Sequence, residues 1–328
     1  MTGAVAVARR LPAYALALLA LASLDFALPQ LMPGDPAAAF LGQDALVELS
    51  AAQRDQLLAE LGLDQPLWRQ YVAHLGQLVR LDLGQSLRHG LPVAELLAQH
   101  LPWTLLLAGA ALAGALVMGT LLGMEAAFAQ GGWIDRALTA AMLAMESVPT
   151  FAVAMGLVLL FAYGLPWFPA AGAMAPFSSA TGLAAWSERA HHLALPVAAL
   201  ALPASAGIFL VSRAAAVAML PRLFMDTARA KGVGRFALRY RHLAPNVLAV
   251  VVARLGGLSA RIVSNGIFVE IVFAYPGINL LLTDAIAKHD YPLVRGALLA
   301  IGLLLFALNL AADLLVARMA QRAGRLPS

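Results

Sequence analysis

Cysteine is absent from the sequence, which excludes disulfide bonds, thiol catalysis and cysteine-based metal sites within the chain. Charged residues are scarce as well: they make up 12% of the 328 residues, and Lys231 and Lys288 are the only lysines. Hydrophobic residues, in contrast, make up 61%, and the mean hydropathy is +0.79. Because a soluble protein of this length cannot hide so much apolar surface, the composition predicts an integral membrane protein.

Several motifs typical of enzymes are also absent. The chain has no G-x-x-x-x-G-K-[ST] run, so it lacks a phosphate-binding loop of its own, and neither H-E-x-x-H nor G-x-S-x-G occurs. The pairs His191–His192 and His289–Asp290 supply only two donors each, which seldom make a metal site. The basic residues are not interleaved with exposed aromatics, which argues against nucleic-acid binding. We therefore expect a protein that is not an enzyme and holds no metal or cofactor itself.

The apolar residues fall into six runs, each long enough to cross a bilayer as a helix of about 20 residues. The sequence thus predicts an all-α protein with six transmembrane helices at about residues 11–31, 103–127, 137–163, 193–211, 247–273 and 293–316. This pattern divides the chain into an N-terminal part with the first helix (1–32), a segment between the first two spans (33–102) and a core of five spans (103–328). A cleaved signal peptide is the alternative for the first run, but Asp25, Pro29 and the LMPGDP sequence do not resemble a small-residue cleavage site.

The distribution of Lys and Arg predicts the orientation in the membrane. With the N-terminus inside, the inner segments carry 13 Lys and Arg residues and the outer segments, which are much longer in sum, carry six. We therefore expect a multi-pass protein with both termini in the cytoplasm.

The outer segment, residues 33–102, is predicted to be a small and mostly helical cap. Ser50 and Gln53 form a capping box for a helix that Gly62 would end, and Pro66 would open a second helix. The RLDLGQSLRHG stretch has no helical period and is typical of a loop, and Pro92 would start a short helix through Leu97. The segment is either a passive cover or a docking surface for an outside partner.

Residues 213–246 form the longest inner loop and carry seven Lys and Arg residues against one acid, Asp226. Pro221 is placed to open a helix, Gly232 to end it and Gly234 to permit a sharp turn. A second basic helical piece would then run from Arg235 to Leu243 and stop at Pro245. Small residues between the charges let another protein approach the backbone closely. Topology and lipid contact explain the charge of this loop but not its pattern.

This loop resembles the cytoplasmic loop of ABC-importer permeases, which has the pattern E-A-A, three residues, G, nine residues, I-x-L-P. Asp226, Ala228, Gly232 and Pro245 match that pattern in type and spacing, whereas Thr227, His242 and Ala244 differ. The TARAKG form is similar to the dipeptide, oligopeptide and nickel branch. Further stretches resemble the same branch, in this order along the chain: LMPGDPA, LDLGQSLRHGLPVAELL, LPWFPAAG and VEIVFAYPGINLLLTDAIAKHDYPLVRGALL.

The resemblance implies a type I ABC importer permease fold in the bacterial cytoplasmic (inner) membrane. It implies a coupling loop that docks on an ATP-binding subunit through residues Asp226, Thr227, Ala228, Arg229, Ala230, Lys231 and Gly232. Its implied partners are two ATP-binding subunits, a second, homologous permease subunit and an extracytoplasmic substrate-binding protein, with ATP bound by the partner alone. The expected cargo is a di- or oligopeptide. Nickel or another small chelated solute is the alternative within the family, and a proton-coupled secondary transporter is the alternative outside it.

Four ionisable residues within the predicted spans are candidates for the translocation path: Asp25, Glu146, Arg261 and Glu270. The acids would bind an ammonium group of the substrate and Arg261 a carboxylate, or the charges pair with one another to hold helices together. Nine residues separate Arg261 from Glu270, about 13 Å along a helix, so these two cannot pair locally. Gly119 and Gly123 form a small-xxx-small face that favours helix packing or a subunit interface. Pro149, Pro196 and Pro203 would act as hinges or as static kinks.

Overall fold

A computed structural model describes residues 11–31, 53, 65–176, 178 and 181–323. Every regular element in these ranges is a helix, and one isolated β-bridge joins Gln85 to Pro92. The predicted all-α class is thereby confirmed for the described residues. They form two compact units. The larger unit contains Thr104–Tyr275 and the chain from Ala307 onward, and the smaller unit contains the described residues up to Trp103 together with Pro276–Phe306.

The smaller unit is built around the ends of two long helices. Its elements are α2 (Leu11–Leu31), α6 (Leu67–Val79), the first turns of α7 (Val93–Phe128), α15 (Ile278–Ala287) and the first part of α16 (Tyr291–Ala323). Val93, Leu97, Ile278 and Leu293 are buried together in its core. The apolar faces of α7, α15 and α16 therefore meet here, and burying them excludes water from the helix contacts.

Two predictions about the outer segment fall on this unit. The helix that Pro66 was expected to open is confirmed as α6, with Pro66 as its N-cap. The RLDLGQSLRHG stretch forms a loop, as expected. The carboxylate of Asp290, which precedes α16, accepts hydrogen bonds from the Ser86 hydroxyl and from the backbone N–H groups of Leu87 and Arg88 in this loop. The helix expected between Ser50 and Gly62 lies outside the described residues, apart from Gln53.

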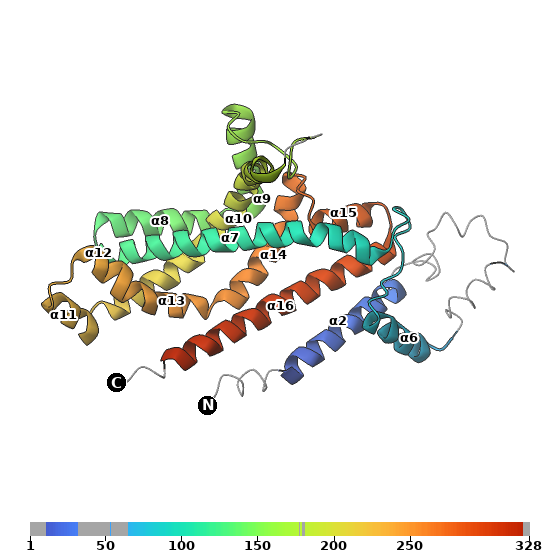
Figure 1. Cartoon of the computed structure of the whole chain (residues 1–328), viewed down its shortest axis with the longest axis horizontal. Coiled ribbons are helices and arrows are strands. Elements are labelled where there is room, and N and C mark those ends of the chain that lie inside the picture. The colour runs from blue at the N-terminus through green and yellow to red at the C-terminus, as the bar shows by residue number, and fades with distance from the viewer. Residues whose placement is uncertain (1–10, 32–52, 54–64, 177, 179–180, 324–328) are drawn as a thin grey trace. The chain divides into compact units, whose positions relative to one another are not determined.

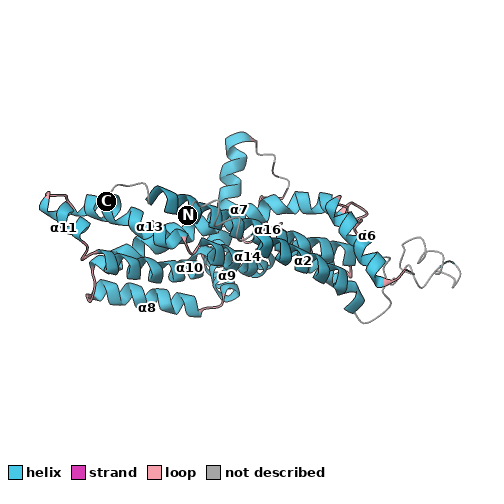
Figure 2. Ribbon diagram, turned by 90° about the horizontal axis from the view of Figure 1, so that it is seen from below, coloured by secondary structure: helices cyan, strands magenta, loops and turns pink. Residues whose placement is uncertain are grey.

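The larger unit carries the remaining helices. After α7 come α8 (Trp133–Ser147), α9 (Thr150–Leu157), the π-helical turn η1 (Val158–Gly164), α10 (Gly182–Met219), α11 (Leu223–Ala230), α12 (Arg235–Ala237), η2 (Leu238–Leu243), α13 (Ala244–Val252) and α14 (Leu255–Val272). Helices α8 and α10 lie side by side (Figures 1 and 2).

Four described helices are long and apolar enough to cross a membrane: α7, α10, α14 and α16. The count rises to five if α8 and α9–η1 make one bent span. In α2 the apolar stretch is the shorter Pro12–Ala27. The structure thus bears out a multi-span helical protein, and the full set of six spans stays a prediction.

Four expected element boundaries are wrong. The span expected over 247–273 is divided between α13 and α14, with Ala253 and Arg254 at the break. The span expected over 137–163 is split at Val148 and Pro149, where its halves meet at 101° (Figure 1). The separate short helix expected from Pro92 to Leu97 is instead the start of α7, which continues through Pro102. The basic helix expected to stop at Pro245 runs on from η2 into α13, with Pro245 in the first turn of α13.

Gly119 and Gly123 bring α7 into close contact with α10. A Cβ atom built on Gly119 would lie 2.6 Å from the Ser205 carbonyl oxygen, and one on Gly123 would lie 2.7 Å from that of Phe209. Only hydrogen fits at these two positions, so the backbones approach as small-residue faces allow in membrane helices. The predicted packing role of the two glycines is confirmed within this chain.

Candidate functional site

The loop that the charge distribution predicts to lie inside folds as two short helices joined by a glycine turn. Helix α11 ends at Ala230, and Gly232 then adopts a left-handed φ of +74°, which side chains other than hydrogen disfavour. Its N–H donates to the Arg229 carbonyl oxygen, which closes the end of the helix. Gly234 precedes α12 in an extended conformation. The predicted sequence of helix, turn and helix is therefore confirmed.

Most side chains of this loop point away from the subunit. Of the seven residues expected at the dock, six are exposed: Asp226, Thr227, Arg229, Ala230, Lys231 and Gly232. Ala228 is buried, so its methyl group packs inside the subunit. Asp226 and Arg229 form an exposed ion pair of 2.9 Å that adds little stability. The expected small-residue surface is thus made of Ala230 and Gly232, with charges around it.

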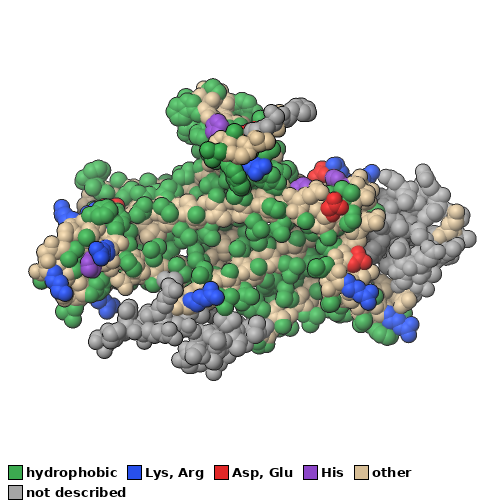
Figure 3. Space-filling model, in the orientation of Figure 1, with side chains coloured by type: hydrophobic (Ala, Val, Ile, Leu, Met, Phe, Trp, Pro, Cys, Tyr) green, Lys and Arg blue, Asp and Glu red, His purple; other side chains and the backbone are tan. Residues whose placement is uncertain are grey.

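Three large apolar side chains are exposed on the same loop: Leu223, Phe236 and, to a lesser degree, Phe224 at 40%. Leu223 is 84% exposed and Phe236 is 76% exposed. Figure 3 shows Lys and Arg side chains around the end of the larger unit that carries α11 and α12, at the left of the view. Apolar side chains within a charged surface are typical of a protein interface. Residue type alone could not identify Leu223 and Phe236 as interface candidates, because apolar residues occur throughout the sequence.

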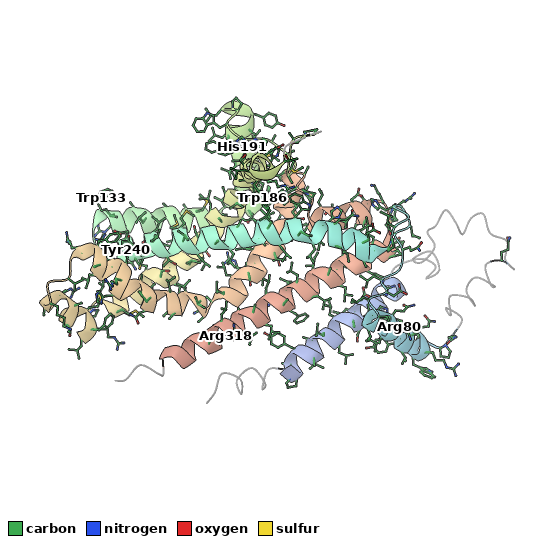
Figure 4. The ribbon with its side chains drawn as sticks, viewed as in Figure 1. Arg80, Trp133, Trp186, His191, Tyr240 and Arg318 are labelled. Carbon is green, nitrogen blue, oxygen red and sulfur yellow. The ribbon has the colours of Figure 1, made fainter. Side chains whose placement is uncertain are left out.

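The second helix of the loop is fastened to the end of α7. Arg239 and Tyr240 both donate to the carboxylate of Glu125, and the Arg239 guanidinium lies over the Phe128 ring at 4.5 Å from its centroid. The hydrogen bond to Glu125 raises the pKa of the Tyr240 phenol, and burial raises it further. Tyr240 lies close to the end of α7 (Figure 4). Arg239 and Tyr240 therefore join the loop directly to α7. Sequence reasoning missed Glu125, since only tertiary contact gives it a partner.

A second ion pair braces the same unit. Both nitrogens Nε and Nη2 of Arg213 donate to the Asp135 carboxylate, at 2.6 and 2.7 Å, and the Gly131 N–H donates to it at 3.0 Å. Asp135 is buried, so this pair ties α8 to α10 with satisfied hydrogen bonds.

The structure distributes the four candidate path residues over three places. Asp25 lies in the smaller unit, where Oδ2 faces His74 and Arg295, each at 3.2 Å. Arg295 also donates to His74 Nδ1 at 3.1 Å. This buried cluster joins α2, α6 and α16, which favours a structural role for Asp25. His74 and Arg295 were not among the predicted residues.

Glu270 is fully buried in the larger unit, on α14, and accepts a hydrogen bond of 2.9 Å from the Thr104 hydroxyl. Its carboxylate is therefore enclosed by the helices of its own unit and is not open to a cavity.

Glu146 and Arg261 are brought together. Their closest atoms, Glu146 Oε1 and Arg261 Nη1, are 3.7 Å apart, and both side chains are partly exposed. They line a cavity of about 390 Å³ at the bend between α8 and α9, together with Pro149, Asn265 and Phe268. Pairing between an acid and Arg261, one of the two readings of these charges, is thus observed.

The histidine pairs do not collect metal ligands. His191 and His192 face backbone carbonyl oxygens of Trp167, Ala171 and Gly172. Among the described residues there is no group of three His, Cys, Asp or Glu side chains placed to hold a metal ion.

Long apolar helices joined by a basic loop define a helical protein with several candidate membrane spans. Residues 119–325, more than half of the chain, match the family described as the binding-protein-dependent transport system inner membrane component. The chain belongs to this family, whose members are membrane transport permeases.

Curated relatives agree along most of the length. A protein of Brucella suis biovar 1 named as a candidate peptide permease is 38% identical over 90% of this chain and 92% of its own. A Brucella abortus protein named for a peptide transport system permease is 34% identical over 91% of this chain and 92% of its own. The dipeptide transport system permease protein DppB of Alkalihalophilus pseudofirmus is 30% identical, again over 91% and 92%.

Proposed function

We propose that this chain is a permease subunit of an ATP-driven importer that moves di- or oligopeptides into the cell. Family membership supports the transport role, and the names of the curated relatives support peptides as the cargo. The observation that carries the mechanism is the structure of the inner loop. Leu223 and Phe236 are exposed within its basic surface, and Arg239 and Tyr240 bind the loop to Glu125 of α7.

The loop is the dock for the ATP-binding subunits. Asp226, Thr227, Arg229, Ala230, Lys231 and Gly232 offer charges and a low backbone, and Leu223 and Phe236 offer the apolar contact. The chain has no phosphate-binding loop, so ATP is bound and hydrolysed by that partner. Closure of the partner would pull on the loop and, through Arg239 and Tyr240, on α7.

The assembly has two ATP-binding subunits, a second homologous permease subunit and a substrate-binding protein on the outer face. Six spans with both termini in the cytoplasm fit the surplus of Lys and Arg in the inner segments. Residues 33–102 then lie outside, where the substrate-binding protein delivers its cargo.

Replacing Phe236 with Asp is expected to remove most of the co-purifying ATP-binding subunit and to abolish ATP-dependent peptide uptake. A desolvated aromatic anchor at the centre of an interface contributes about 2 kcal/mol or more, and a carboxylate there would be buried without a partner. Affinity purification of the co-expressed complex, followed by uptake in proteoliposomes, measures both quantities.

Trp68→Asp is the matched control, since Trp68 is 63% exposed but lies on α6, away from the loop in sequence and in a different unit. It should leave ATPase co-purification unchanged. Gel filtration of each variant checks folding. A Phe236→Asp protein that retains both its ATP-binding subunit and its uptake would refute the dock.

A further inference from the structure

One face of α14 carries polar groups along a helix that is long and apolar enough to span the membrane. Arg254 is the N-cap residue, and Arg261 and Asn265 follow seven and eleven positions later. At 3.6 residues per turn these three positions fall on one side of the helix. Arg254 and Arg261 are exposed on the subunit, and Asn265 is partly so. Hydrocarbon cannot solvate such a stripe, so this face meets water or another protein and not lipid tails.

Two cavities open on this face. Arg261 and Asn265 line the cavity of about 390 Å³ at the α8–α9 bend. Arg254 lines a second cavity of about 570 Å³ together with Arg222, Asn246 and mostly apolar residues of α10 and α13. Both volumes fall in the range of roughly 300–1,000 Å³ that small-molecule sites occupy. Seven residues separate the two arginines, a rise of about 10 Å.

The two arginines keep donors available for a ligand. Arg213 is held by Asp135 through two short hydrogen bonds, but Arg261 faces Glu146 at 3.7 Å, which is beyond hydrogen-bonding distance. In the part of the chain that the structure describes, Arg254 has no acidic partner at all.

We propose that Arg261 and Arg254 are two successive binding positions for the carboxylate of a transported peptide. This inference rests on the proposed importer function, and it identifies the peptide carboxylate as the group that the permease itself binds. Glu146 is the resting counterion of Arg261. When a peptide enters, its carboxylate pairs with the Arg261 guanidinium, and its ammonium group pairs with the Glu146 carboxylate that Arg261 has released. The carboxylate then passes along α14 to Arg254 at the second cavity.

Cysteine accessibility tests the positions without relying on delivery by the binding protein. The chain has no cysteine, so Asn265→Cys and Asn246→Cys each place a single thiol in this chain, in the first and second cavity. Both are labelled in the assembled complex with anionic and cationic methanethiosulfonates, with rates normalised to a free thiol. Val117→Cys, at an exposed apolar position of α7, is the control for a surface that faces lipid.

We expect the anionic reagent to be preferred at both cavity thiols and Val117→Cys to stay unlabelled. Adding Arg261→Gln or Arg254→Gln should lower the preference at the nearby thiol about three- to fivefold, as one unit charge at close range in water allows. A free dipeptide should slow labelling, and its C-terminal amide should not.

At Asn265→Cys, an anionic preference that survives Arg261→Gln overturns the binding position at Arg261. At Asn246→Cys the comparison includes Arg222→Gln, because Arg222 lines the same cavity, and a preference that falls with Arg222→Gln but not with Arg254→Gln overturns the position at Arg254. Protection of Asn246→Cys by anionic lipid but not by dipeptide overturns the position at Arg254.

Uptake by the reconstituted complex gives the second readout. Arg261→Gln is expected to lower uptake of the free dipeptide about tenfold, the cost of one charge-assisted hydrogen bond, and to leave uptake of the amidated dipeptide unchanged. Arg318→Gln, an exposed arginine of α16 that lines neither cavity, should change neither (Figure 4).

An equal fall for both peptides in Arg261→Gln means that the residue is only structural, and it overturns the inference. A wild-type complex with no ATP-dependent uptake at all refutes the importer function instead, so the two failures are distinguishable.

Discussion

Alanine in place of Gly123, Gly119 or both is expected to destabilise the permease sharply, although alanine is the better helix former. The new Cβ would lie 2.7 Å from the Phe209 carbonyl oxygen or 2.6 Å from that of Ser205. Both obstacles are backbone atoms and cannot rotate away, so α7 and α10 must separate. Overpacking of this kind costs about 1–3 kcal/mol per site. Thermal denaturation of the detergent-solubilised complex, followed by gel filtration, measures the loss.

Gly109→Ala on the same helix is the matched control. Nothing lies within 4 Å of a Cβ built there, and alanine is favoured over glycine in a helix by about 1 kcal/mol. The control should therefore leave the melting temperature unchanged or raise it. If all three alanine variants melt alike, the close approach of α7 and α10 is wrong.

Removing the side chain of Arg213 should have an effect of similar size. Arg213→Ala leaves the buried Asp135 carboxylate with the Gly131 N–H and the Thr139 hydroxyl as its hydrogen-bond donors. Breaking a buried pair by removing one partner costs about 3 kcal/mol or more, because the remaining charge is stranded. We expect a lower melting temperature and less assembled complex in the membrane, measured by thermal denaturation and immunoblotting.

The double variant Asp135→Asn with Arg213→Met provides the comparison. It removes both charges and keeps the volume, and such neutral replacements of ion pairs are often tolerated. Its stability should therefore lie closer to the wild type than that of Arg213→Ala. Equal destabilisation by the single and double variants would show that the charge pair is not what holds α8 to α10.

The inner loop shows how far a local pattern reaches. Proline and glycine positions predicted its helix, turn and second helix, because these residues act on the backbone within a few positions. The pattern did not predict that Ala228 faces inward or that Leu223 and Phe236 are exposed. Which side of a short helix is covered depends on neighbours, and here those neighbours come from η2.

The long helices show what a local pattern does not predict. Hydropathy located the apolar runs but did not detect that α8 and α9 meet at 101°, nor that α7 starts ten residues before its expected span. Pro149 bends the chain whereas Pro102, Pro196 and Pro203 lie within continuous helices. Packing against neighbouring helices decides whether a proline bends a helix, and no single residue encodes it.

The sequence by itself determined that this chain belongs in a membrane, that its regular structure is helical and that residues 213–246 contain a helix, a glycine turn and a second helix. Composition and short-range spacing are sufficient for these properties, since they follow from solvent and backbone preferences. The tertiary structure alone decided the pairing of charges. It buried Asp25 beside Arg295, enclosed Glu270, and left Glu146 and Arg261 beside a cavity. Residues far apart in sequence meet only when helices pack, so a charge found in a span becomes a brace or a binding group only through its neighbours.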